Sequence, residues 1–563
     1  MVALGVNMSD VDTIVIGSGA GGLAAAVAMA RSGEKVLVLE QHDVPGVWCH
    51  SFRLGGHWFS PGVHYLGELG EGGRMRRLYE GLGVANDLTF LELNPDGFDH
   101  LTIGKEKFDI PKGKENLIQR LKERFPNEAK GIDRYFEIVN GILREMGPFL
   151  PETPVAEPPL WKMPFVKPYL SRWGLRSLKS TMDSCMKDPL LKAILAVQIG
   201  DTGLGTSEIP TAVHASVQGH YFDGGYYPKG GGAAIPRAFL SQLKKNGGQL
   251  KVKSGVRRIL VEKDLDGTPR AIGVVLDDGT QIRSKRVISN ADPAVTLGRL
   301  VNPEFIGWRT KRALAKTRWS VSAISLFMAA DVDAEALGLD SGNYWYNENT
   351  DVDEAFRLAE GKTFDGSRLA GQFLTCTSLK DRSKGLGNTH TFEAFAFVPY
   401  EGFREWTHTR YGERPADYAE MKKQLTDKML VGLERFAPGL SSKVTFAELG
   451  TPLTNEHYCA STKGNLYGTA KTRAQVGPFA WQIRSEVKDL FLVGASTVGH
   501  GVFGGHVSGV LAAAKALKIN AAELLRAEGQ SIRILPCDDT SAWPLDMQER
   551  MALKRGASTE AVA

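Results

Sequence analysis

Apolar runs and glycine clusters alternate at the start of the chain and predict a strand–helix–strand unit. Residues 13–17 (TIVIG) form a short apolar run rich in β-branched side chains, which is typical of a buried parallel strand. Residues 23–33 (LAAAVAMARSG) contain strong helix formers and end on a glycine, which suits the end of a helix. Residues 35–40 (KVLVLE) read as the next strand. We therefore predict a βαβ unit within about 30 residues.

Three glycines between the first strand and the helix are spaced as GxGxxG. Gly17 permits a tight turn, Gly19 lets the backbone approach a pyrophosphate, and Gly22 lets the helix pack closely on the strand. The helix N-terminus attracts phosphates, and Glu40 at the end of the second strand can accept hydrogen bonds from ribose hydroxyls. The pattern predicts a dinucleotide site formed by Gly17, Ser18, Gly19, Ala20, Gly21, Gly22, Glu40 and Gln41.

A second glycine turn lies near the other end of the chain. Residues 489–496 (DLFLVGAS) read as a buried strand that ends in a turn, and residues 497–517 continue through glycines into a helix of small residues. Between the two ends, residues 252–262 predict a strand, and 274–282 (VVLDDGTQI) predict a hairpin with Asp278-Gly279 in its turn. No second GxGxxG is framed by a strand and a helix, so we find no site for NAD(P)H and predict a flavoprotein with one nucleotide.

Composition narrows the class of protein further. The chain has 563 residues, of which 42% are hydrophobic and 23% charged, as in folded globular proteins. Its net charge of +4 comes from 68 basic and 64 acidic residues, a balance that does not favour nucleic acid as a partner. Five separated cysteines with no CxxC pair indicate reduced thiols in a cytoplasmic protein and no metal site. The first residues do not predict a signal peptide, and no run reaches the roughly 18 apolar residues of a membrane-spanning helix.

Taken together, these motifs resemble the phytoene desaturase-related family of FAD-dependent, amine-oxidase-type flavoproteins, and within it the carotenoid isomerases and retinol saturases. The resemblance extends to EQHDVPGVWCHSF (40–52), FSPGVHYLGELGEGG (59–73), the HA…HY…GGYYPKGGG order within 200–236, VISNADP (287–293) and LFLVGASTVGHG (490–501). It implies FAD as the cofactor, adenine contacts from Val256, and a flavin end held by Gly494, Ser496 and Val507. One position departs from the family pattern, because Gly46 is followed by Val47 where a second glycine is usual.

The fold class that this resemblance implies is α/β, with a Rossmann-like FAD-binding domain of the glutathione-reductase/amine-oxidase type and an inserted α+β substrate domain. We expect the FAD-binding domain to consist of residues 1–79, 226–295 and 481–527. The substrate domain is expected at 80–225 and 296–480, and residues 528–563 are expected to form a partly disordered C-terminal tail, since they contain scattered charges, prolines and small residues.

The implied activity is that of an FAD-dependent oxidoreductase acting on carbon–carbon double bonds of an apolar isoprenoid, as in retinol saturases. Two alternatives stay open: a carotenoid cis/trans isomerase or desaturase, and a flavin-binding carrier or assembly protein without turnover. An amine oxidase is less favoured, because no aromatic cage for an amine is visible. An external electron donor or acceptor is needed for net reduction or desaturation, and no motif identifies it.

Reduction of an alkene needs a proton as well as a hydride, and a tuned histidine or tyrosine can supply it. His64 and His220 lead as catalytic residues, because each stands among aromatic residues and glycines (GVHYLG and GHYFDGG). Weaker candidates are Tyr65, His214, Tyr226, Tyr227, His500 and His506. Asp201 is expected to cap a loop rather than to act as a base.

Residues 151–180 combine aromatic and basic side chains in a way that suits an anionic membrane surface. Trp161, Phe165, Tyr169 and Trp173 recur every four residues with lysines and arginines between them, and 161–180 contain no acid. The alternative is a proline-rich loop whose aromatic residues pack on the domain's own core. Residues 124–146 predict an amphipathic helix that buries Ile132, Tyr135, Phe136, Val139 and Ile142.

Overall fold

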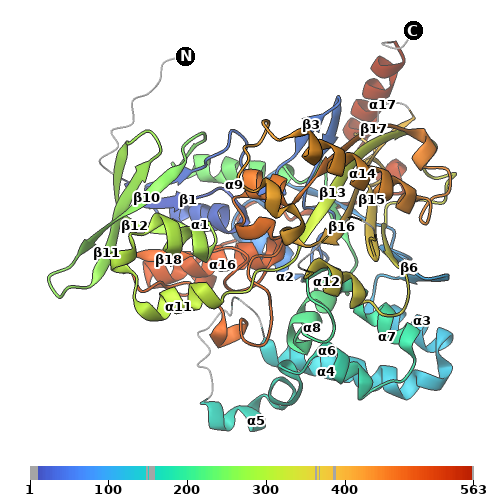
Figure 1. The fold of residues 1–563 in the computed structure, drawn as a ribbon, viewed down its shortest axis with the longest axis horizontal. Helices are drawn as coiled ribbons and strands as arrows, with labels where there is room; N and C mark the ends of the chain where they lie inside the picture. Colours follow the sequence, from blue (N-terminus) through green and yellow to red (C-terminus); the bar gives the residue numbers. More distant parts are fainter. Residues whose placement is uncertain are drawn as a thin grey trace.

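A parallel sheet gathers strands from the beginning, middle and end of the chain in the computed structural model (Figure 1). The structure describes residues 11–147, 150, 159–361, 364, 366, 368–384 and 388–560. The central strand β1 (Val11–Ile16) pairs with β2 (Val36–Leu39), which pairs with β9 (Gln249–Lys251). On its other side β1 pairs with β12 (Gln281–Ser289), which pairs in turn with β18 (Leu490–Leu492). The predicted meeting of the two glycine-flanked strands on one sheet is confirmed.

Small residues let two helices pack closely beside this sheet. Helix α1 (Ala20–Arg31) follows β1 and packs against α16 (Gly501–Leu517), the helix that follows β18, and against α9 (Ala234–Lys245). A β-carbon placed at Gly509 of α16 would lie only 2.2 Å from the carbonyl oxygen of Gly21. The two helices therefore touch backbone to backbone, which explains why both are built from glycine and alanine.

An antiparallel hairpin extends the sheet at the β12 edge. Strands β10 (Val256–Lys263), β11 (Pro269–Leu276) and β12 pair in order, so the predicted hairpin is confirmed. Its turn has Gly279 at φ +88°, in the left-handed region, and the Thr280 N–H donates to the Asp278 carboxylate at 2.9 Å. The Asp-Gly pair thus fixes the register of β11 against β12.

A second, mostly antiparallel sheet forms the core of the other half of the molecule. Its strand order is β17 (Val444–Gly450), β13 (Ser322–Asp331), β16 (Thr389–Val398), β15 (Gly371–Cys376), β14 (Asn343–Asn347), β6 (Asp99–Ile103) and β7 (Glu106–Ile110). One cluster of buried side chains joins β13, β14, β15 and β16 to α14 (Ala416–Leu433). Shorter elements around the two sheets are β3 (Phe52–Leu54), β4 (His57–Phe59), α10 (Pro293–Val295), α11 (Trp308–Lys316), α12 (Glu354–Ala359), α13 (Thr377–Lys380) and α15 (Pro452–Cys459).

A layer of helices packs beside the β6–β7 end of the second sheet (Figure 1). The predicted amphipathic helix is α4 (Ala129–Met146), and its five expected core residues are at most 2% exposed, which confirms the prediction. Around it lie α3 (Lys114–Arg124), α6 (Leu178–Asp183), α7 (Pro189–Ala196) and α8 (Thr211–His220). Helix α2 (Arg74–Gly81) instead packs in the buried cluster that includes α1 and α16. The short helix α5 (Met163–Val166) stands at the edge of the molecule (Figure 1).

The C-terminal segment is more ordered than its composition suggested. Strand β19 (Arg533–Pro536) pairs in parallel with β5 (Thr89–Glu92), which also pairs with β8 (Tyr226–Pro228). Trp543 is 3% exposed and its indole N–H donates to the Pro536 carbonyl at 2.7 Å, ahead of helix α17 (Leu545–Glu560). The expected disordered tail is corrected for this segment, because a few apolar residues among the charges are enough to anchor it.

The strands of the two large sheets fall inside the residue ranges assigned to the two domains, while the three-stranded sheet joins 89–92, 226–228 and 533–536 across those ranges. The domain boundaries therefore remain a prediction. None of the helices in the described part of the chain is both long enough and apolar enough to cross a bilayer.

Candidate active site

The first glycine turn leaves room only for backbone at the end of β1. Gly17 has φ +87°, and a β-carbon at Gly22 would lie 2.2 Å from the Gly17 carbonyl oxygen. A β-carbon at Gly19 would lie 2.4 Å from the Asn290 amide nitrogen. The turn opens into a cavity lined by Gly19, Ala20 and Gly21. Such a cradle of backbone before a helix N-terminus fits the pyrophosphate of a dinucleotide.

The second glycine turn lies directly against the first. Gly494 has φ +97°, and its N–H donates to the Ser508 hydroxyl at 2.8 Å. A β-carbon at Gly21 would lie 2.9 Å from the Gly494 nitrogen, and both residues line the same cavity. Ser496 and Val507 line it as well. The two ends of the chain thus form one shared crevice, as the sequence predicted.

Asn290, at the end of β12, connects the two turns and was not singled out from the sequence. Its side-chain oxygen accepts a hydrogen bond from the Gly22 N–H at 3.1 Å, and it lies close to both Gly19 and Gly494. It belongs to VISNADP, a motif that carried the resemblance, but only the fold brings it to Gly22, 268 positions away.

The acidic residue at the end of β2 is buried and preorganised. Glu40 is 3% exposed; one of its oxygens accepts from the Ser18 N–H at 2.9 Å and the Ser18 hydroxyl at 2.6 Å, and the other accepts from the His42 N–H at 3.0 Å. Gln41 is exposed. Val256 begins β10 next to Gly255, where a β-carbon would lie 3.7 Å from that of Gln41. These predicted adenosine-side residues gather at one end of β2.

The departure at Gly46-Val47 produces an unusual backbone. Gly46 has φ +116°, and Val47 has φ +52°, a left-handed conformation that is costly for a β-branched residue. Val47 lines the cavity, and its Cγ2 would stand 3.6 Å from a β-carbon at Gly19. The valine therefore borders the first glycine turn without filling it.

One cavity of about 1370 Å³ continues from the glycine turns into the second half of the molecule. Apolar side chains such as Leu170, Val217, Phe373 and Phe395 form much of its wall. Its polar wall includes His64, Tyr65, Asp201, His220 and Lys471. The cavity can therefore hold an extended apolar molecule beside a cofactor bound at the two turns.

His64 faces the cavity with a buried acid behind it. Its Nδ1 is 3.2 Å from an oxygen of Glu393, which is 2% exposed and whose other oxygen accepts from the Ser60 N–H at 2.6 Å. The imidazole also lies 5.0 Å, centroid to centroid, from the Phe373 ring. The Glu393 carboxylate and the Phe373 ring therefore border the imidazole, and no described residue is hydrogen-bonded to its Nε2.

His220 is held by the loop that it contacts. Its Nε2 accepts a hydrogen bond from the Gly67 N–H at 2.9 Å, and its Nδ1 is 3.7 Å from an oxygen of Glu68. The ring stacks on Phe503 at 5.7 Å. Both ring nitrogens face the 67–68 loop, so His220 lines the cavity mainly with its ring.

Four of the weaker candidates, His214, Tyr226, Tyr227 and His506, do not line the cavity. Burial lowers the pKa of His214 to about 4 and that of His506 to about 3, so both are neutral. Tyr226 donates to the Asp223 carbonyl at 2.9 Å, and the Tyr227 hydroxyl is 3.1 Å from the Lys384 ammonium.

Two cavity residues have a role that sequence reasoning missed. Asp201 was expected to cap a loop, but its carboxyl accepts from the Tyr65 hydroxyl at 3.0 Å and lines the cavity. Lys471, which is 4% exposed, donates to the Ala495 carbonyl at 2.5 Å in the second glycine turn. Burial lowers its pKa to about 7. Neither residue stands in a motif that signals burial, since only distant segments enclose them.

Comparison with known proteins assigns this architecture to a family. Residues 20–386 match the family described as flavin containing amine oxidoreductase. The chain is 30% identical over 536 residues to an all-trans-retinol 13,14-reductase of Danio rerio, covering 89% of this chain and 85% of that protein. It is 26% identical to prolycopene isomerase 1, chloroplastic, of an Oncidium hybrid cultivar, over 89% and 83% of the two chains. A solved oxidoreductase from Methanosarcina mazei has the same fold, with a TM-score of 0.60 at 17% identity, over 89% and 99%.

Proposed function

The chain belongs to the flavin-containing amine oxidoreductase family, and on that premise we propose that it reduces a carbon–carbon double bond of a retinoid-like isoprenoid. It is an FAD-dependent oxidoreductase that acts on carbon–carbon double bonds. The observation that carries the substrate proposal is the cavity, because it begins at the two glycine turns and most of its wall surface is apolar. A retinoid has this character: a long apolar polyene that barely dissolves in water.

Each part of FAD has a matching group of residues in the crevice. We propose that Gly17–Gly22 hold the pyrophosphate, that Glu40 and Gln41 hold the adenosine ribose, and that Val256 contacts the adenine. The flavin end would lie at Gly494, Ser496 and Val507. When bound, FAD supplies hydride transfer to or from a substrate carbon, and the protein's task is to orient the polyene and exclude water.

Saturation also needs a proton at the neighbouring carbon. His64 and His220 remain predictions for its source, and Asp201 is a third group on the same wall. The contacts of His220 with the 67–68 loop suit a residue that positions the wall, whereas His64 has Nε2 available.

Anaerobic mixing of the reduced holoenzyme with all-trans-retinol tests the proposal. The expected product has one double bond fewer than all-trans-retinol, and one flavin should be reoxidised per molecule of product. A changed cis/trans pattern without net oxidation would instead support the isomerase alternative, and reduction of oxidised flavin by the polyene would support a desaturase. A flavin that stays reduced with every retinoid and carotenoid offered would support a carrier.

We further propose that the mouth of the cavity rests on an anionic membrane surface through residues 159–180; residues 151–158 of the predicted segment lie outside the described residues. Trp161 and Phe165 are 70% and 83% exposed, and the Lys162 ammonium lies over the Trp161 ring at 4.9 Å. Met163, Leu170 and Leu175 of the same segment line the cavity. An apolar substrate could thus pass from lipid to the cavity without crossing water.

The five cysteines are free thiols, which fits the reducing cytoplasm proposed as the compartment.

Sedimentation with vesicles tests this contact. Each Lys or Arg near an anionic surface contributes about 1 kcal/mol, so binding should require anionic lipid and weaken with salt. Phe165→Glu should release the protein, whereas Leu545→Glu should not. Leu545 is 75% exposed but begins α17, far from α5 (Figure 1). Equal binding of both variants would contradict the proposal.

A further inference from the structure

Two carboxyl groups approach the same phenol hydroxyl at the polar wall of the cavity. The Tyr65 oxygen is 3.0 Å from an oxygen of Asp201 and 3.3 Å from an oxygen of Asp99. A phenol has one hydrogen and can donate it to only one carboxylate at a time. Two ionised carboxylates this close in a buried site repel strongly, so one of them keeps a proton.

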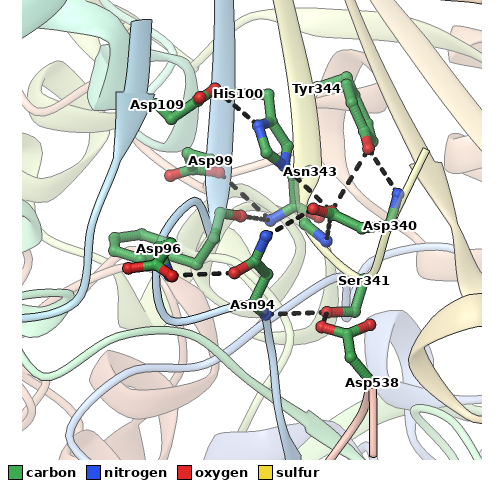
Figure 2. Close-up of polar contacts among 12 residues, drawn as sticks. Asn94, Asp96, Asp99, His100, Asp109, Asp340, Ser341, Asn343, Tyr344 and Asp538 are labelled. Carbon is green, nitrogen blue, oxygen red and sulfur yellow. Dashed lines mark hydrogen bonds and ion pairs between the residues drawn. The ribbon is translucent and has the colours of Figure 1, made fainter. Parts of the chain in front are cut away.

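The surroundings of the two acids decide which one keeps it. Asp99 is fully buried on β6, where it accepts from the Trp345 indole N–H at 3.1 Å. It also accepts from the Asn343 amide at 3.2 Å, as Figure 2 shows. The buried Lys380 ammonium, which donates to the His64 carbonyl at 2.6 Å, adds a nearby positive charge. These donors stabilise Asp99 as the anion. Among the described residues, the side chains that donate to Asp201 are the phenols Tyr65 and Tyr221, so the proton belongs to Asp201.

Of the described ionisable groups around Asp201, the tyrosines and His500 are neutral and Asp99 is charged. Tyr65, Tyr221 and Tyr467 have a pKa raised well above its usual value by burial, and stay neutral. Burial lowers the pKa of His500 to about 3, so it is neutral as well. Burial, followed by the charge on Asp99, raises the pKa of Asp201 to about 7, whereas that of Asp99 reaches about 6.

Asp201 also lies at the cofactor end of the cavity. The carbonyl of the preceding Gly200 accepts from the Tyr467 hydroxyl at 2.9 Å, and Tyr467 is followed by Gly468. A β-carbon at Gly468 would lie 2.7 Å from the Ser496 hydroxyl oxygen, so this segment packs on the second glycine turn. A polyene carbon beside the flavin would therefore be close to the Asp201 carboxyl.

We infer that Asp201, held by Tyr65 and Asp99, is the acid that protonates the substrate double bond. The inference rests on the proposed function. Reduced FAD would supply a hydride, with its electron pair, to one alkene carbon, and the adjacent carbon takes the proton of the Asp201 carboxyl. The C=C π bond, the Asp201 O–H bond and the flavin–hydrogen bond would break, two C–H bonds would form, FAD would be left oxidised, and Asp201 becomes a carboxylate that accepts from Tyr65. Water then returns a proton to Asp201. Tyr65 and Asp99 act as positioning residues.

The pH dependence of kcat/KM of the holoenzyme tests the inference. Since the acid form is active, the rate should fall as pH rises through about 7. Tyr65→Phe removes a hydrogen bond to the Asp201 carboxylate and should move this fall in kcat/KM, the alkaline limb of the pH profile, to higher pH. Asp99→Asn removes a repelling charge and should move it to lower pH. Tyr467→Phe is the matched control, because it removes a hydroxyl of the same wall that donates to Gly200, and should leave the limb in place.

Direct replacement gives the second arm of the test. Asp201→Asn should lower kcat by roughly 10²–10⁴ with FAD affinity unchanged, because that is the usual contribution of a general acid. Asp201→Glu should recover part of the loss with a shifted limb, which shows that any failure of Asp201→Asn is not misfolding. Full turnover in Asp201→Asn, or limbs that do not move in Tyr65→Phe and Asp99→Asn, would overturn the inference.

An infrared titration separates this inference from the proposed function. The purified protein should show a carboxylic-acid C=O band that disappears as pH rises through about 7 and is missing in Asp201→Asn. If no retinoid is turned over but this band is present, the substrate proposal fails while the protonated Asp201 stands. If the band is missing from the wild type, the inference fails whatever the substrate.

Discussion

Gly509→Ala tests how the two glycine turns are held together. A methyl group at this position of α16 would lie 2.2 Å from the Gly21 carbonyl oxygen, 2.8 Å from the Ala25 nitrogen and 2.9 Å from the Ala24 β-carbon. Carbon–oxygen contacts in proteins are about 3.3 Å or longer, so α16 must move away from α1 by roughly 1 Å.

The expected cost follows from two opposing effects. Overpacking of this kind destabilises by about 1–3 kcal/mol, and contacts with rigid backbone favour the upper end. Replacing glycine by alanine inside a helix returns about 1 kcal/mol. We expect the free energy of unfolding to fall by about 2 kcal/mol, which lowers the Tm of a domain of 150–250 residues by about 4–8 °C. Because α16 begins at the second turn, FAD should also bind about tenfold more weakly, equivalent to about 1.4 kcal/mol.

Thermal unfolding of the apoprotein and fluorescence titration with FAD measure the two effects. Gly505→Ala is the matched control on the same helix, since its methyl would first meet the Ala20 β-carbon at 3.2 Å and needs only a small shift. Its Tm should match that of the wild type. A Gly509→Ala variant as stable as Gly505→Ala, with unchanged FAD affinity, would refute the backbone contact between α1 and α16.

Three other changes test separate parts of the structure. Lys471→Met should stabilise the apoprotein at pH 7 by up to about 4 kcal/mol, because burial lowers the pKa of Lys471 and the folded state therefore disfavours the charged amine. This destabilisation is complete below about pH 7 and absent above pH 10.5. Urea unfolding should show this gain disappear at high pH. His100 lies 2.7 Å from Asp109 and 3.0 Å from Asp340 (Figure 2), hydrogen bonds that outweigh burial and raise its pKa to about 9. Protonated His100 should contribute about 2 kcal/mol to the free energy of unfolding, after allowing for its partial exposure. This contribution should be present below pH 6.5 and be lost as pH rises through about 9, and the same assay should not detect it in His100→Gln. Val47→Gly relieves about 1–2 kcal/mol of left-handed strain but adds up to about 1 kcal/mol of unfolded-state entropy, so its Tm should rise slightly, and a clear drop would argue against strain at φ +52°.

Local patterns were sufficient to predict the elements that hold the nucleotide. The βαβ unit, the Asp278-Gly279 hairpin and the buried face of α4 each follow from the periodicity or turn chemistry of adjacent residues. The pairing of β18 with β12 required the further inference that two glycine turns share one ligand.

The polar groups of the cavity could not be predicted in the same way. Tyr65 and Asp201 are 136 positions apart, and Glu393 lies 329 positions from His64, so no spacing in the sequence shows that they meet. Their chemistry depends on burial, which tertiary packing alone creates. The C-terminal segment shows the same limit, because a polar composition concealed the strand that pairs with β5.

A structure of the protein with FAD bound would test the central claim most directly. The account predicts one FAD per chain, with its pyrophosphate on the backbone of the Gly17–Gly22 turn and its flavin ring at the 494–496 turn, facing the cavity wall that carries Asp201. A pyrophosphate bound elsewhere, or a flavin ring turned away from that cavity, would contradict it.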